Sequence, residues 1–146
     1  MVRLGQGVVS VGWDIVGSMV NIRITPDGIA PPAARYAHAV LSDGSGRLLH
    51  TSGVVPVAPD GTVPEAIADQ ARVVWANISA MLAQAGMGPD DVVSVTTYVI
   101  PGQDLAAVMA ARDAALGGQL AASTLVVVPE LAQPAWKMEI AVVAAS

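Results

Sequence analysis

Hydrophobic residues recur at steps of three and four in the middle of the chain, a spacing typical of an amphipathic helix. Pro64 suits its first turn and Gly86 suits the position just after its last turn. The apolar stripe between them consists of Ile67, Ala71, Val74, Ile78 and Leu82. A second helix is predicted from Asp104 to Leu116, because Gly117 follows it at once and stops it.

Shorter apolar segments, rich in β-branched residues, predict strands around these helices. Tyr36 to Leu41 and Arg47 to Ser52 flank the turn Ser42-Asp-Gly-Ser-Gly46, a pattern typical of a β-hairpin. Further strands are predicted at Asn21 to Ile24, Val92 to Ile100, Ser123 to Val128 and Trp136 to Ala144. The order of elements predicts an α+β fold in which two helices cover one face of a sheet.

The other face of this sheet needs a cover as well. Val92 to Ile100 and Leu125 to Val128 are apolar on both sides. The chain as a whole is 53% hydrophobic and only 13% charged, which is more apolar surface than a lone domain of this size easily hides. We therefore expect sister subunits to cover the free face in a symmetric oligomer.

The first 18 residues differ from the rest and are expected to form an N-terminal extension to a single domain at residues 19–146. The apolar run from Val8 to Val20 is interrupted by Asp14 and is too short to span a bilayer. A net charge of −5 without a basic run argues against nucleic acid and anionic membranes as partners. We therefore expect a cytoplasmic protein that binds neither.

The composition also excludes several kinds of site. The chain has no cysteine, which excludes a disulfide framework, a thiolate nucleophile, sulfur-ligated zinc and an iron–sulfur cluster. It has two histidines, His38 and His50, in no metal-binding spacing, so no metal site is expected. The sequence Gly-x-Ser-x-Gly of many serine hydrolases is absent.

Glu139 is the most conspicuous acidic residue, because the strand around it is otherwise apolar. Alternation places it on one side with Lys137, Ala141 and Val143. Two interpretations follow: either Glu139 pairs with Lys137 or another cation as part of the structure, or it is a general acid or base whose pKa is raised by burial.

Tyr36 and His38 are two residues apart on a predicted strand and so share a face, where both could line a cleft. A tyrosine hydroxyl can orient a substrate, and a histidine can move a proton near neutral pH. In the structural alternative, Tyr36 is an interface aromatic residue and His38 a hydrogen-bonded core group.

Four segments together resemble the RidA family, also called the YjgF family. They are Pro31-Pro-Ala-Ala-Arg-Tyr-Ala-His-Ala39, His50-Thr-Ser-Gly-Val-Val-Pro56, Asp91-Val-Val-Ser-Val-Thr-Thr-Tyr98 and Lys137-Met-Glu-Ile-Ala141. The resemblance covers roughly residues 20–145. It implies a chorismate-mutase-like α+β fold, a homotrimer around a central barrel and ligand clefts between subunits. It also implies hydrolysis of reactive enamines or imines to a keto acid and ammonia without a cofactor.

The resemblance also implies roles for individual residues. Glu139 and Tyr36 match the family's catalytic carboxylate and cleft tyrosine, and Ser52 with Gly53 matches its ligand-binding pair. The expected substrate-binding residues are Ser52, Gly53, His38, Thr124 and Arg112. The arginine that clamps the substrate carboxylate is taken to fall on Ala122, within Ala121-Ala-Ser-Thr124 where Pro-Ala-Arg-Ser is usual. The family's cysteine, two positions after the arginine, falls on Thr124, and the family's asparagine in the second helix falls on Met109.

A methyl group cannot replace the planar, charged fork of a guanidinium. Arg112 and Arg35 are the nearest arginines in sequence that could take its place. Two functions are therefore expected: a cofactor-free enzyme acting on a small enamine, imine or enol-type intermediate in a specialised pathway, or a non-catalytic trimer that binds a metabolite or a partner in the same clefts.

Overall fold

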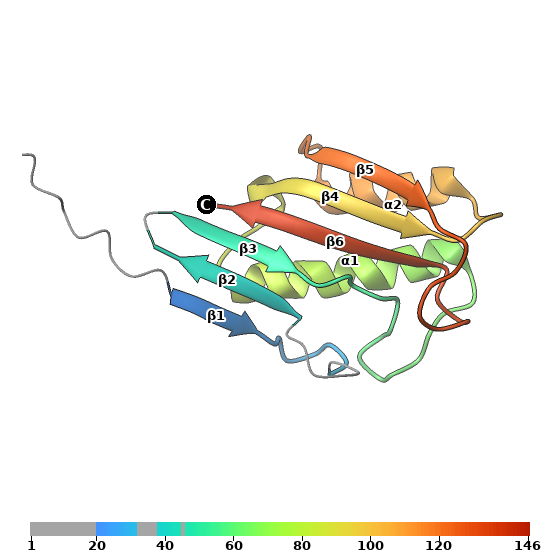
Figure 1. Cartoon of the computed structure of the whole chain (residues 1–146), viewed down its shortest axis with the longest axis horizontal. Coiled ribbons are helices and arrows are strands. Elements are labelled where there is room, and N and C mark those ends of the chain that lie inside the picture. The colour runs from blue at the N-terminus through green and yellow to red at the C-terminus, as the bar shows by residue number, and fades with distance from the viewer. Residues whose placement is uncertain (1–19, 32–37, 45) are drawn as a thin grey trace, which may run out of the picture.

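The fold is built on one six-stranded sheet, which the computed structural model describes through residues 20–31, 38–44 and 46–146. The strands lie in the order β1-β2-β3-β6-β4-β5 (Figure 1). Their bounds are β1 Val20–Ile24, β2 Ala39–Asp43, β3 Arg47–Thr51, β4 Val92–Val99, β5 Ala122–Val127 and β6 Met138–Ala145. Neighbouring strands are antiparallel except for the parallel pair of β4 and β5.

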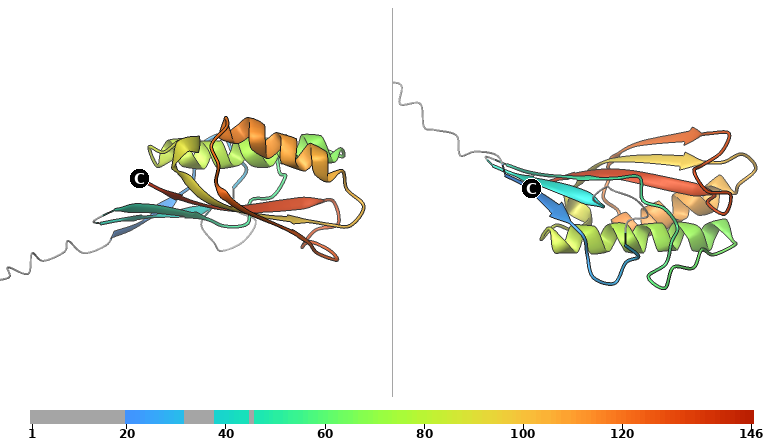
Figure 2. Two further views of the ribbon diagram at one scale, coloured as in Figure 1. Left: turned by 90° about the horizontal axis from the view of Figure 1, so that it is seen from above. Right: turned by 60° about the horizontal axis from the view of Figure 1, so that its bottom comes forward.

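Two helices, α1 (Ile67–Gln84) and α2 (Leu105–Leu116), lie side by side on one face of this sheet (Figure 2). A short 3₁₀ helix, η1 (Pro89–Asp91), leads into β4. The connection between the parallel strands β4 and β5 runs through α2, as a parallel pair requires. The predicted α+β fold with two helices on one face is therefore confirmed.

The ends of the helices follow from local chemistry. Asp104 caps α2, because its carboxylate accepts hydrogen bonds from the main-chain N–H groups of Ala106 and Ala107 at 3.0 and 3.2 Å. Gly117 ends α2 in the left-handed conformation with φ 59°, which costs a glycine little.

The predicted start of the first helix at Pro64 was wrong, because Ala66 is still extended and α1 begins at Ile67. Pro64 instead belongs to a segment tied to the body of the protein by the buried amide of Gln70. This amide donates to the main-chain oxygens of Pro64 and Ala135 at 2.7 and 2.8 Å.

The strand bounds in the structure differ from the predicted bounds at the hairpin and at the last strand. Ser42 and Asp43 extend β2 instead of forming the turn, because they pair with Leu48 and Arg47. At the other end Trp136 precedes β6, which begins at Met138. Tyr36 and its neighbours, at residues 32–37, lie outside the described residues, as does the expected extension at residues 1–18.

The core fills the space between the sheet and the helices. On β6 every second side chain is buried there: Met138, Ile140, Val142 and Ala144 are at most 1% exposed. They pack with the apolar side of α1, of which Ala71, Val74 and Ile78 are fully buried. The alternation predicted for this strand is therefore confirmed, and Glu139 is on its other side.

The face of the sheet turned away from the helices, which we call the open face, has no covering element in the described part of the chain (Figure 2). Ser94, Thr96 and Tyr98 of β4 are only partly buried there. Leu48 and Val126 are 40% and 39% exposed. A subunit that covers this face, as the expected trimer would supply, stays a prediction. No helix within the described ranges is long and apolar enough to cross a membrane.

Candidate active site

Glu139 lies on the open face of β6, directly opposite Tyr98 of β4. Its partly buried carboxylate lines a hollow of about 290 Å³ at the end of the sheet. The other lining residues are Gly53, Tyr98, Val128, Glu130, Leu131 and Ala141. Among the described residues, the wall of this hollow, which we call the glutamate hollow, contains two acidic side chains and no basic one.

Position 53 has no room for a side chain, because the carboxylate of Glu139 lies against it. A Cβ atom at this position would lie 1.5 Å from Oε1 of Glu139, far closer than any real contact. The approach is fixed by the next residue, Val54, which exchanges hydrogen bonds of 2.7 and 3.1 Å with the main chain of Ile140. Main-chain pairing therefore places the glycine against the carboxylate, and any side chain here would displace Glu139.

Burial raises the pKa of the Glu139 carboxyl above its ordinary value of 4.5. Lys137 does not counter this effect, since its ammonium group donates to the main-chain oxygen of Glu65 at 2.6 Å. The ion pairs formed among residues 20–31, 38–44 and 46–146 are Arg72 with Asp69 and Arg112 with Asp113. The geometry thus favours the acid–base interpretation of Glu139 over that of a structural pair with Lys137.

His38 and Ser52 are held together by their main chains, because the N–H of Ser52 donates to the oxygen of His38 at 2.8 Å. Nε2 of His38 lies 2.9 Å from the main-chain oxygen of Ala30. The ring lines a second cavity of about 80 Å³, together with Gly53, Trp136 and residues of α1. Gly53 is thus shared by both cavities, whereas His38 lines the one next to α1.

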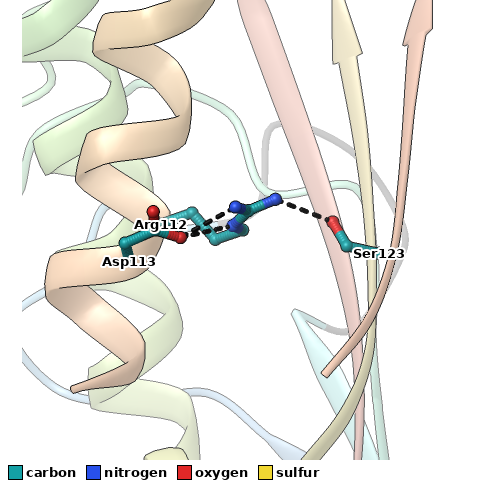
Figure 3. A network of polar contacts seen from close by, with 3 residues as sticks. All are labelled: Arg112, Asp113 and Ser123. Atoms are coloured by element: carbon teal, nitrogen blue, oxygen red, sulfur yellow. Dashed lines mark hydrogen bonds and ion pairs between the residues drawn. The ribbon is translucent and has the colours of Figure 1, made fainter. Parts of the chain in front are cut away.

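Arg112 of α2 is tied to its own helix and to β5 (Figure 3). Its Nε and Nη2 donate to Oδ1 of Asp113 at 2.9 and 2.8 Å, and its Nη1 donates to Oγ of Ser123 at 3.2 Å. Ser123 pairs with the buried Val95 and so faces the helices. Within one chain Arg112 therefore lies on the side of the sheet opposite to Glu139.

The segment of β5 that aligns with the family's arginine contains none. Ala122 and Thr124 pair with Ser94 and Thr96 on the open face, and both are exposed. A residue-by-residue match of Ala121–Thr124 to Pro-Ala-Arg-Ser gives the arginine's place to Ser123, whose side chain faces the helices instead. Thr124 shares a face with Glu139, but β4 lies between their strands.

Most of the lining residues of the glutamate hollow, among them Tyr98, Glu130 and Leu131, were not predicted as site residues from the sequence. Tyr98 was detectable in principle, since alternation along β4 puts it on the open side, but its place opposite Glu139 depends on the pairing register. Glu130 and Leu131 follow the end of β5 in an irregular segment, and no pattern in the sequence marks them. Within the described ranges no three His, Cys, Asp or Glu side chains gather as a metal site.

The model of the family described as Endoribonuclease L-PSP matches residues 28–146, most of the chain. The chain belongs to this family, which is the RidA or YjgF family. The resemblance inferred from its four short segments is thereby confirmed. The matching range includes β2 to β6 and every described residue of the glutamate hollow.

Two curated relatives and one solved structure illustrate the kinship. A RutC family protein of Haemophilus influenzae is 42% identical over 93 residues, 63% of this chain and 66% of that protein. The 2-iminobutanoate/2-iminopropanoate deaminase of Escherichia coli is 39% identical over 70 residues, 47% of this chain and 55% of the enzyme. The chain spans about half the length of the curated relatives named as deaminases.

The fold agrees over a longer stretch than the sequences do. The Rid family protein YyfA of Yersinia pestis has a crystal structure described as that of a protein of unknown function. It superposes with a TM-score of 0.78 at 27% identity, over 87% of this chain and 100% of YyfA. The relatives therefore include proteins named as reactive-intermediate deaminases and proteins without an assigned function.

Proposed function

We propose that the protein hydrolyses small reactive imines or enamines to a carbonyl compound and ammonia, with Glu139 as the group that moves the proton. The observation that carries this proposal is a carboxyl with a raised pKa in an open hollow, in close contact with a glycine and with no cationic partner among the described residues. The relatives named as deaminases support the same reaction class.

The proposed reaction needs one water molecule and one proton carrier. The carboxylate of Glu139 accepts a proton from water as the oxygen attacks the carbon of the protonated imine, and a neutral carbinolamine forms. The carboxyl then returns the proton to nitrogen. As the carbon–nitrogen bond breaks and ammonia leaves, the hydroxyl of the carbinolamine gives its proton to the Glu139 carboxylate and becomes the carbonyl oxygen, and ammonia takes this proton away as ammonium. A pKa raised by burial suits both steps, because the same group must gain and lose a proton near neutral pH.

Other residues expected at the site have supporting roles in this proposal. Tyr36 orients the substrate, and Ser52 with the Gly53 amide holds a polar substituent, with His38 as a further binding residue. Thr124 and Arg112 lie away from the glutamate hollow of their own chain and would contact the ligand from a neighbouring subunit. We further propose a cytoplasmic homotrimer that needs no cofactor and acts in a specialised pathway. Static light scattering at micromolar protein tests the assembly, and a monomeric mass would contradict it.

The test of the reaction uses imines made in situ by an amino-acid oxidase and trapped with semicarbazide. The wild-type protein should consume the imine and lower the yield of semicarbazone. Glu139→Gln should reduce this rate by about 10²- to 10⁴-fold, because the proton carrier is lost. Glu65→Gln removes the same charge outside the hollow and should leave the rate unchanged.

Two outcomes would contradict the proposal in different ways. An undiminished rate in Glu139→Gln would remove this residue from the mechanism. No effect of the wild-type protein on any imine, together with a raised melting temperature in the presence of carbonyl compounds, would favour the non-catalytic binding role instead.

A further inference from the structure

The wall of the glutamate hollow has an unusual charge for a site that would take a 2-imino acid. Of its seven lining residues in the described part of the chain, two are acidic, Glu130 and Glu139, and none is basic. A substrate carboxylate in this space would meet negative charge and, among the described residues of its wall, no guanidinium or ammonium group. Like charges at close range cost free energy, whereas a neutral or positively charged ligand escapes that cost.

Two basic side chains of the described residues form contacts away from the hollow. Lys137 is two residues from Glu139, yet its ammonium donates to the main-chain oxygen of Glu65. Arg112 is held by Asp113 and Ser123 on the helix side of the sheet, as Figure 3 shows. Neither cation therefore neutralises the wall of the hollow in this chain.

Glu130 is well placed to act on a ligand because its segment is anchored at both ends. Before it, the N–H of Val128 donates to the oxygen of Val99 at 2.9 Å. After it, the side-chain amide of Gln70 on α1 donates to the main-chain oxygen of Ala135 at 2.8 Å, and Pro129 and Pro134 restrict the main chain further. Glu130 lines both the glutamate hollow and an adjoining hollow of about 370 Å³.

We propose that Glu130 sets the substrate class of this site: small imines or enamines without a carboxylate, neutral or protonated on nitrogen, are preferred over 2-imino acids. This inference rests on the proposed hydrolysis at Glu139. It adds a residue that touches no reacting bond and acts through its charge. The protonated imine is also the more electrophilic form, so a negative wall favours both its binding and its attack by water.

The test compares two imines made in situ. One is 2-iminopropanoate, formed from alanine by an amino-acid oxidase, and the other is the imine formed from propylamine by an amine oxidase. Each catalysed rate is divided by the uncatalysed rate of the same imine, which removes their difference in intrinsic reactivity. The wild-type protein should favour the imine from propylamine.

Substitution of Glu130 should change this preference without abolishing turnover. Glu130→Gln should lower the ratio of the two rates roughly two- to fivefold, the size expected for an exposed charge. Glu130→Arg should lower it further, and the effect should shrink at about 1 M salt, where the screening length falls to about 3 Å. Glu65→Gln, an equal change of charge outside the hollow, should leave the ratio unaltered.

The failures of the two proposals are distinguishable. If neither imine is consumed by the wild-type protein, the proposed hydrolysis fails and the substrate class falls with it. If both are consumed and Glu130→Gln leaves the ratio unchanged, or if 2-iminopropanoate is preferred, hydrolysis stands and the role of Glu130 is overturned.

Discussion

The two sides of strand β6 consist of alternate residues of one short segment, yet one side forms the core and the other carries the candidate catalytic carboxyl. Met138, Ile140 and Val142 face the helices and are at most 1% exposed, whereas Glu139, Ala141 and Val143 face the open side and are partly exposed. The buried side supplies apolar area for stability. The open side carries a carboxyl whose burial is unfavourable for its charged form. Stability and chemistry are thus separated by the alternation of a single strand.

The largest expected effect comes from breaking the buried side. Ile140→Ala should lower the free energy of unfolding by about 2–5 kcal/mol, because it leaves a cavity in a fully buried site. Urea denaturation measures the change.

Val143→Ala, on the open side of the same strand, is the matched control and should cost less than about 1 kcal/mol in a single chain. A larger cost that grows with protein concentration would show that another subunit covers the open face. Equal costs at both positions, independent of concentration, would contradict the difference between the sides.

A second substitution disrupts the close contact between the main chain of Gly53 and the carboxyl of Glu139. Gly53→Ala places a Cβ atom 1.5 Å from the present position of Glu139 Oε1, so the carboxyl must move. We expect a loss of about 1–3 kcal/mol in the free energy of unfolding and at least about tenfold in imine turnover.

Gly88 provides the control for this change, since nothing lies within 4 Å of a Cβ built there and its φ of −136° is open to any residue. Gly88→Ala should leave both turnover and stability nearly unchanged. If Gly53→Ala behaved in the same way, the close contact with Glu139 would have no consequence.

The smallest effect concerns the stability cost of Glu139 itself. Burial raises the pKa of this carboxyl above the 4.5 of an ordinary glutamate, so the folded state binds its proton more tightly than the unfolded state does. Its contribution to stability is therefore present below about pH 4.5 and is lost as the pH rises through the raised pKa of the folded state.

Glu139→Gln does not titrate and avoids this loss. The variant should gain in free energy of unfolding relative to the wild-type protein between pH 4 and pH 7, by less than about 1 kcal/mol because the carboxyl is only partly buried. Denaturation at both pH values measures the difference. A gain toward low pH instead would mean that the folded state favours the carboxylate.

Local patterns were sufficient to predict the helices, the strands and the side of β6 on which Glu139 lies. The stripe of α1 and the alternation of β6 are properties of consecutive residues, so the sequence shows them directly. The start of α1 at Ile67 was missed: Pro64 lies outside the helix, and its main-chain oxygen accepts from Gln70, which also binds a residue far along the chain, Ala135.

The wall of the candidate site was harder to predict. Tyr98 meets Glu139 only through the register of β4 with β6, which shifts at a bulge between Val92 and Ser94. Glu130 enters the hollow through an irregular segment. The position of the Arg112 guanidinium is set by Asp113 and Ser123, and a resemblance between sequences says nothing of such contacts.

The most direct test of the account is a crystal structure with a small unreactive carbonyl compound such as propanamide, an uncharged analogue of the proposed substrates. We expect its carbonyl or amide group to lie within hydrogen-bonding distance of Glu139 in the hollow formed with Gly53, Tyr98 and Glu130. Binding beside His38 in the other cavity, with the glutamate hollow left empty, would contradict the claim that Glu139 is the centre of the site.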